Sequence, residues 1–191
     1  MKVAFINGSP RRGSGVSARL LRALEERLPG CEVSCGWGEA CGAYVFAFPL
    51  YVDGIPSNLL RELVAHERGL PPGARIYAIV NNGFYEGEQN APALAILRNW
   101  SRRAGLAWGQ GIGVGAGPML DSVPPDRGPM KALGRALDTL AANILAGAGG
   151  EDIYTRPGFP RALYKLGGTA SFRAEAKKNG LSKRDVERVG L

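Results

Sequence analysis

The sequence is poor in the residue types that form most catalytic and metal sites. It contains one histidine and three cysteines among 191 residues. His66 falls near the end of a predicted helix, where a histidine is more typical of the surface than of a catalytic or metal site. Cys31, Cys35 and Cys41 are spaced C-x3-C-x5-C, whereas a four-iron cluster normally takes four cysteines with tight CxxC spacing. We therefore expect no metal site, and we assign the cysteines to ordinary strand packing.

A long apolar run is also missing. The longest uncharged apolar stretch, Ala43–Val52, has about half of the ~20 residues that a membrane-spanning helix needs. The N-terminus enters an apolar strand directly and has no signal-peptide layout. An odd number of cysteines suits a reducing compartment better than a secreted disulfide framework. We expect a cytoplasmic protein that does not bind membranes.

Acidic residues are scarce in the last fifth of the chain. Residues 156–191 hold nine basic side chains and three acidic ones, whereas residues 1–155 carry a net charge of only +1. Such a cationic segment is usually a solvated face, and the alternative is a place near an anionic cofactor or an acidic patch of a partner subunit. No helix-turn-helix or base-reading motif accompanies it, so we expect no nucleic-acid partner.

The remaining sequence alternates short apolar runs with longer helical patterns, as βαβ units on a parallel sheet do. One connection is short, because residues 36–43 fall below the ~10–12 that a crossover helix requires. The helix there must be reduced to a turn, or the second strand is misplaced. The pattern predicts strands over residues 3–6, 31–35, 44–48, 76–80 and 106–114, and helices over residues 16–28, 59–64, 94–100 and 130–144.

The pattern thins after residue 150. We predict one domain over residues 1–150, and we interpret residues 151–191 as a basic appendage packed on that domain. Trp100 is expected in the core, whereas Trp37 and Trp108 fit either a binding site or an interface. The apolar side chains available to dock the appendage are Ile153, Tyr154, Phe159, Leu163, Tyr164 and Phe172.

Three predicted strands end in loops rich in turn formers and hydrogen-bonding groups, and ligands of open α/β sheets bind beyond such ends. The first loop, residues 7–17, offers hydroxyls, guanidiniums and backbone N–H groups at a helix N-terminus, which together bind phosphate. It contains neither GxxxxGK[ST] nor a GxGxxG motif paired with an acidic residue. The alternative is a Ser/Gly loop that only caps the helix.

The second and third loops, residues 49–56 and 81–87, add aromatic and amide groups. In the second, Tyr51 stands where an apolar strand leaves the core and would form a wall for a planar ligand. The third combines two asparagines and two glycines with Phe84 and Tyr85. For both loops the alternative is ordinary packing of aromatic side chains against their own scaffold.

Together these motifs resemble the flavodoxin-like NAD(P)H-dependent FMN oxidoreductases. They read Gly-Ser-Pro-Arg at 8–11, Pro-Leu-Tyr at 49–51 with Gly-Ile-Pro-Ser at 54–57, and Asn-Asn-Gly-Phe-Tyr-Glu-Gly at 81–87. Residues 108–113 and 160–166 are also similar to the family, so the resemblance covers nearly the whole chain. It implies an α/β three-layer sandwich, with a five-stranded parallel sheet in the order 2-1-3-4-5 and helices on both faces.

The resemblance also implies which residues bind FMN. The chain departs from the family at two places. The phosphate loop of the family often has Asn-Thr where this chain has Gly15-Val16, and the residue before the third strand is often acidic where this chain has Gly42. The FMN phosphate is expected at Ser9, Arg11, Ser14, Gly15, Val16 and Ser17. The ribityl chain and ring are expected beside Pro49, Leu50, Tyr51 and Asp53. The pyrimidine edge is expected at the backbone N–H groups of Asn81, Asn82, Gly83, Phe84 and Tyr85.

The implied activity is hydride transfer from NADH or NADPH, through FMN, to a small acceptor such as a quinone, a nitro or azo compound, or free flavin. The cofactor carries this chemistry, so we predict no catalytic acid or base. The family also implies a homodimer. One alternative is an electron carrier of the flavodoxin type, although such carriers are typically acidic and this chain has a net charge of +7. The other is a regulatory or nucleic-acid-binding flavoprotein that acts through its basic tail.

Overall fold

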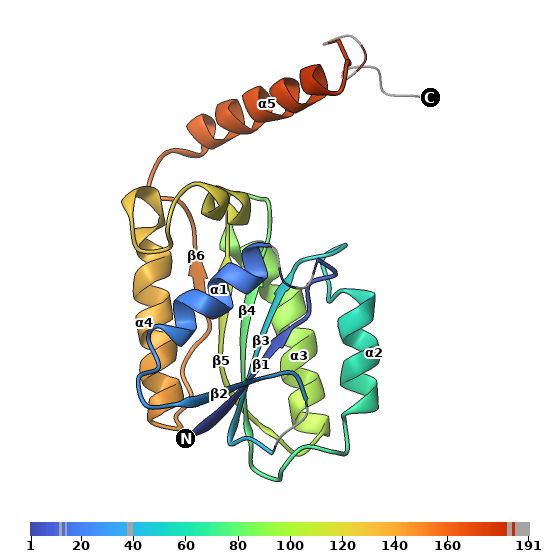
Figure 1. The fold of residues 1–191 in the computed structure, drawn as a ribbon, viewed down its shortest axis with the longest axis vertical. Coiled ribbons are helices and arrows are strands. Elements are labelled where there is room, and N and C mark those ends of the chain that lie inside the picture. The colour runs from blue at the N-terminus through green and yellow to red at the C-terminus, as the bar shows by residue number, and fades with distance from the viewer. Residues whose placement is uncertain (12, 14, 38–39, 183–184, 186–191) are drawn as a thin grey trace. The chain divides into compact units, whose positions relative to one another are not determined.

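Six parallel strands form one sheet, in the order β2-β1-β3-β4-β5-β6, in a computed structural model (Figure 1). The structure describes residues 1–11, 13, 15–37, 40–182 and 185. The first five strands have the predicted order 2-1-3-4-5, which confirms the flavodoxin-like fold class. The strands are β1 (Lys2–Asn7), β2 (Glu32–Cys35), β3 (Ala43–Pro49), β4 (Arg75–Asn81), β5 (Ala107–Val114) and β6 (Ile153–Thr155).

Helices cover both faces of the sheet. Figure 1 shows α1 (Val16–Glu25) and α4 (Lys131–Leu145) on one face, with α2 (Ser57–Ala65) and α3 (Ala91–Arg103) on the other. Each helix turns one apolar stripe toward the sheet, and β3 is an uninterrupted apolar run because both of its faces are covered. Leucines that fill the two layers include Leu20, Leu24, Leu137 and Leu140 on the first face, and Leu59, Leu63, Leu94 and Leu97 on the second.

The connection between β2 and β3 contains no helix in its described residues, 36, 37 and 40–42. Trp37 packs on the α2 side instead. Its ring stacks on His66 with the ring centroids 4.3 Å apart, and its Nε1 donates to Glu62 Oε2 over 2.9 Å. A large aromatic side chain therefore fills part of the layer that a crossover helix would cover. The strand predicted over residues 31–35 is present as β2, which begins one residue later, at Glu32.

The sixth strand was not expected. β6 pairs with β5 through Ile112–Ile153, Gly113–Tyr154 and Val114–Thr155. The chain divides into two compact units at residues 1–158 and 159–191, so β6 belongs to the first unit rather than to an appendage. The second unit contains α5 (Arg161–Lys178). The docking of Phe159, Leu163, Tyr164 and Phe172 on the domain stays a prediction.

The described part of the first unit also contains three short 3-10 helices: η1 (Gly87–Asn90), η2 (Gly117–Asp121) and η3 (Gly128–Met130). η1 and η2 follow the carboxyl ends of β4 and β5, so both lie at the edge of the sheet where the predicted loops are. None of the described helices is long and apolar enough to cross a membrane.

Candidate functional site

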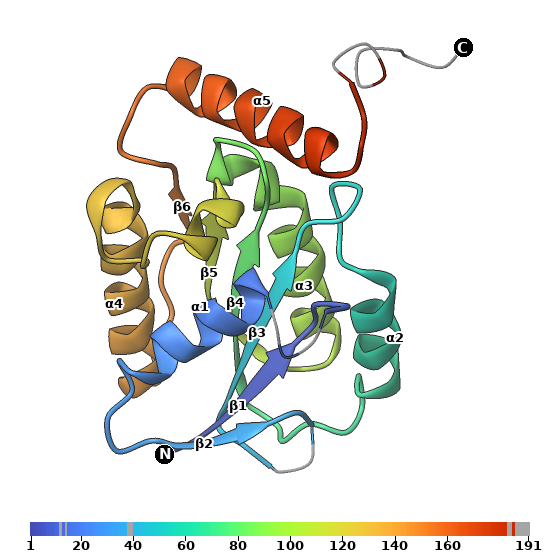
Figure 2. The same cartoon turned by 45° about the horizontal axis from the view of Figure 1, so that its top comes forward.

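The three predicted loops meet at one edge of the sheet. They follow β1, β3 and β4, which are neighbours, and the arrowheads of these strands point to the same edge in Figure 2. The Gly8 amide donates to Ala47 O over 2.9 Å, and the Leu50 amide donates to Asn81 O over 2.8 Å. Backbone hydrogen bonds therefore join the first loop to β3 and the second loop to the end of β4.

The first loop ends at the N-terminus of α1. Gly15 is the N-cap residue in an extended conformation, and as a glycine it has no side chain to cap the helix. The first turn contains no acidic residue, so the positive end of the helix dipole is not neutralised there. Such a terminus can bind an anion through its backbone N–H groups. Ser14, a predicted phosphate ligand, lies outside the described residues.

The start of the first loop is held by its own side chains. Asn7 Oδ1 accepts from the Ser9 amide over 3.0 Å, and Ser9 Oγ accepts from the Arg11 amide over 3.3 Å. A Cβ at Gly8 would lie 2.5 Å from Leu59 Cδ2, so a larger residue there would require the Leu59 side chain on α2 to shift. Ser9 is buried, whereas Arg11 is exposed and its guanidinium can reach an anion in solvent.

The second loop is a two-residue hairpin turn. Tyr51 and Gly54 exchange backbone hydrogen bonds of 3.1 and 2.9 Å across it. Val52 and Asp53 occupy the turn with φ of 47° and 53°, as a type I′ turn requires. Val52 is fully exposed, and Tyr51 is 49% exposed. Tyr51 therefore offers an aromatic surface to solvent beside the ends of β3 and β4.

We expect Val52→Asn to raise the free energy of unfolding by about 1 kcal/mol, because a β-branched residue is strained at positive φ and asparagine tolerates that region. Val52→Thr is the matched control, since threonine is also β-branched and should gain nothing. Urea denaturation of the three proteins measures the difference. Equal midpoints for the Asn and Thr variants would show that the turn carries no such strain.

The third loop is organised by Asn82, which is buried. Its Oδ1 accepts from the Phe84 amide over 2.9 Å, and its Nδ2 donates to Glu86 O over 3.1 Å. The Asn82 amide itself donates to Val114 O over 3.0 Å. The amides of Asn82 and Phe84, both predicted to meet a ring edge, thus have acceptors within the chain. The Phe84 side chain is 54% exposed.

One side chain links the third loop to the first. Asn81 Nδ2 donates to Ser17 Oγ over 3.0 Å and to Phe48 O over 3.1 Å. Asn81 and Ser17 are both buried. The structure therefore brings these two predicted site residues together, and their side chains are hydrogen-bonded to each other.

β6 also borders the site, which sequence reasoning missed. Tyr85 Oη donates to Pro157 O over 3.1 Å, just beyond this strand. Gly87 and Gly113 lie so close to the β6 backbone and side chains that neither position has room for a Cβ. The glycines within β5 were the sequence feature that could have indicated another strand packed closely beside it. Burial raises the pKa of Tyr154 in this strand above its ordinary value, and the carboxylate of the neighbouring Asp152 raises it further.

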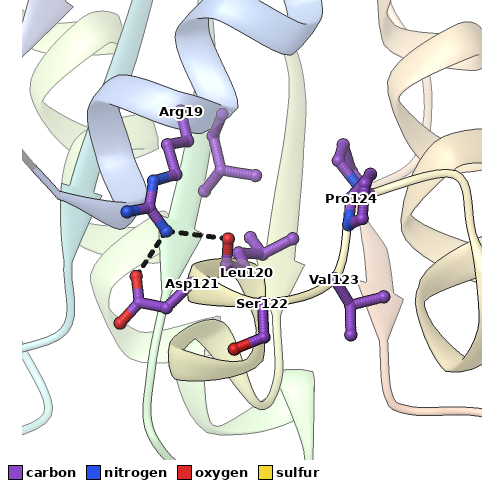
Figure 3. A pocket seen from close by; sticks show the side chains of 8 residues that line it. Arg19, Leu120, Asp121, Ser122, Val123 and Pro124 are labelled. Carbon is purple, nitrogen blue, oxygen red and sulfur yellow. Dashed lines mark hydrogen bonds and ion pairs between the residues drawn. The ribbon is translucent and has the colours of Figure 1, made fainter.

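A cavity of about 300 Å³ lies between α1 and the segment after β5 (Figure 3). Arg19 reaches across it, where its Nη1 donates to Leu120 O over 2.8 Å and to Asp121 Oδ1 over 2.5 Å. The cation is therefore already paired within the chain. The cavity is lined by Arg19, Leu20, Leu120, Asp121, Ser122, Val123, Pro124 and Pro125, none of which was a predicted site residue.

No family model matches the sequence, and no curated protein matches it. Solved structures do match the fold. An FMN-dependent NADH-azoreductase from Bacillus anthracis in complex with FMN superposes with a TM-score of 0.56 and 12% identity, covering 75% of this chain and 99% of that one. A flavodoxin from Streptococcus pneumoniae superposes with a TM-score of 0.54 and 11% identity, covering 78% of this chain and 100% of the flavodoxin. An NAD(P)H:quinone oxidoreductase from Methanothermobacter marburgensis superposes with a TM-score of 0.53 and 14% identity, covering 75% of this chain and 96% of the oxidoreductase. At these identities the likeness establishes the fold and nothing finer.

Proposed function

We propose that the chain binds FMN at the three loops and transfers hydride from NADH or NADPH, through the flavin, to a small acceptor. Quinones, nitro and azo compounds, and free flavin are the acceptor classes. The observation that carries this proposal is the meeting of a helix N-terminus, whose N-cap residue is glycine, with two polar and aromatic loops at the carboxyl edge of a parallel sheet. The FMN named in the azoreductase structure supports the choice of ligand.

The residues present fit an FMN phosphate. The N-cap residue of α1 is a glycine, the first turn of α1 contains no acidic residue, and Arg11 is exposed in the loop before it. Among the described residues, nothing lies within 4 Å of a Cβ placed at Gly13, and a Cβ at Gly15 would approach Arg11 Cβ at 4.0 Å. An anion can therefore approach this backbone without a clash.

The second and third loops fit the flat part of the ligand. Tyr51 and Phe84 are each about half exposed at the ends of adjacent strands, so both can contact a planar ring. A ring edge at the third loop would compete with the internal acceptors of the Asn82 and Phe84 amides. The loop would exchange hydrogen bonds within the chain for hydrogen bonds to the ligand.

Bound FMN would supply the hydride-transfer chemistry of the reaction. The chain then has to hold the rings in register, exclude water from one face and stabilise negative charge that develops at the ring edge. Backbone donors of the third loop can meet the last requirement without a titrating side chain, so we assign no catalytic acid or base. We also propose a homodimer whose second subunit completes the nicotinamide pocket, which light scattering at micromolar concentration tests.

A flavodoxin-type electron carrier is the second candidate function, because a flavodoxin shares the fold. Anaerobic mixing of the FMN-loaded protein with NADH and NADPH separates the two. Rapid bleaching of the flavin absorbance by either nucleotide is expected of a reductase. FMN binding without bleaching would identify a carrier, and no FMN binding at all would overturn both.

A further inference from the structure

Asn81 is the last residue of β4, and its side chain lies at the centre of the three loops. Its Nδ2 is 3.0 Å from Ser17 Oγ and 3.1 Å from the backbone oxygen of Phe48. Ser17 is the second residue of α1, and Phe48 lies near the end of β3. One amide group thus joins the ends of two strands to the first turn of the helix that the phosphate would approach.

The two contacts of the Asn81 amide group determine which atom donates in each hydrogen bond. A backbone carbonyl can only accept, so the atom facing Phe48 O must be the amide nitrogen of Asn81. Both hydrogens of that nitrogen are then used, one for Phe48 O and one for Ser17 Oγ. Ser17 Oγ therefore accepts from Asn81, and its own hydrogen is left to donate elsewhere.

The hydrogen on Ser17 has no second partner among the described residues of the chain. Ser17 is only 2% exposed and Asn81 5% exposed, so the hydrogen bond between them is shielded from solvent. A buried donor without an acceptor is costly, and an anion at the N-terminus of α1 would provide that acceptor. The hydroxyl is thus prepared as a donor for an anion before any ligand arrives.

We propose that Asn81 is a positioning residue for phosphate recognition: it orients the Ser17 hydroxyl as a donor and does not itself touch the phosphate. This inference rests on the proposed binding of FMN. Its consequence is selective, because riboflavin has the same ring and ribityl chain and no phosphate. Loss of Asn81 should weaken FMN binding more than riboflavin binding.

A double-mutant cycle with both flavins tests the inference. Fluorescence titration gives the dissociation constants of FMN and riboflavin for the wild type, Asn81→Ala, Ser17→Ala and the double variant. Ser17→Ala should weaken FMN binding about 10- to 100-fold, the range for a hydrogen bond to a charged group, and change riboflavin binding by no more than about twofold. Ser17→Thr, which keeps a hydroxyl, should restore most of the FMN affinity.

Asn81→Ala should lower the ratio of FMN affinity to riboflavin affinity by about fivefold or more. In the Ser17→Ala background it should change that ratio by less than about twofold, because Asn81 acts through Ser17. If Asn81→Ala does not fold, the same cycle with Asn81→Asp applies. The carboxylate has the size of the amide but must accept from Ser17, and any effect that persists without the Ser17 hydroxyl is direct charge repulsion.

The possible failures are distinguishable. If the wild type binds neither flavin, the proposed function is wrong and this inference falls with it. If the wild type binds FMN but Asn81→Ala weakens both flavins equally, Asn81 is only structural and this inference alone is overturned. Additive effects of the two substitutions on the ratio would likewise show that Asn81 does not act through Ser17.

Discussion

Gly87→Ala is expected to lower the free energy of unfolding by about 3 kcal/mol. A Cβ at Gly87 would overlap the carbonyl oxygens of Gly113 and Thr155, and it would lie 2.7 Å from the Thr155 amide nitrogen. All three atoms belong to the backbones of β5 and β6, so no flexible side chain can move aside. The third loop, or the edge of the sheet, would have to shift.

Gly83→Ala is the matched control in the same loop. Nothing lies within 4 Å of a Cβ at Gly83, so its substitution should change the free energy of unfolding by less than about 0.5 kcal/mol. Urea denaturation at constant temperature measures both variants. A Gly87→Ala variant as stable as the Gly83→Ala variant would show that β6 and the third loop are not packed backbone against backbone.

Asp152→Ala is expected to cost about 2–4 kcal/mol, because it leaves three donors without their acceptor. Asp152 Oδ1 accepts from Trp108 Nε1 over 3.1 Å and from the Gly111 amide over 2.9 Å, while Oδ2 pairs with Arg98. Its side chain is 6% exposed. Arg98 is itself partly exposed and keeps access to water, which places the expected cost below that of a fully buried pair.

Two variants separate the contributions at this position. Asp152→Asn keeps an oxygen for Trp108 and Gly111 and loses the charge facing Arg98, so it should cost about half as much as the alanine variant. Glu151→Ala removes an exposed carboxylate from the preceding residue and should change stability by less than about 0.5 kcal/mol. If Asp152→Ala behaved like Glu151→Ala, the carboxylate would not hold β6 to β5.

Much of the fold could be predicted from the sequence, because apolar runs and helical stripes alternate along residues 1–145. β6 could not. A strand of three residues, Ile153–Thr155, shows no periodicity, and only its pairing with β5 makes it a strand. The position of Trp108 could not be predicted for the same reason, because its indole donates to Asp152 just before β6. The role of a residue that contacts β6 could not be assigned while β6 itself was not recognised.

The position of the candidate site was predictable for a topological reason, because the loops at the carboxyl ends of adjacent parallel strands must lie together. The contacts within the loops were not. The amide of Phe84 bonds to the side chain two residues before it, and Asn81 reaches Ser17 across 64 positions of sequence. The positive φ of Val52 was also hidden, since the usual Asn-Gly signal of a type I′ turn is missing.

Titration of the purified protein with FMN, beside the variant Gly15→Asp, tests the central claim most directly. Gly15 is the extended N-cap residue of α1, where aspartate is a favourable cap, so the variant should be at least as stable as the wild type. Its carboxylate would occupy the place of the phosphate and repel it. We predict that the wild type binds one FMN per chain and that Gly15→Asp binds it at least about tenfold more weakly. A wild type that does not change the flavin spectrum, or equal affinity of the two proteins, would contradict the assignment of FMN to these loops.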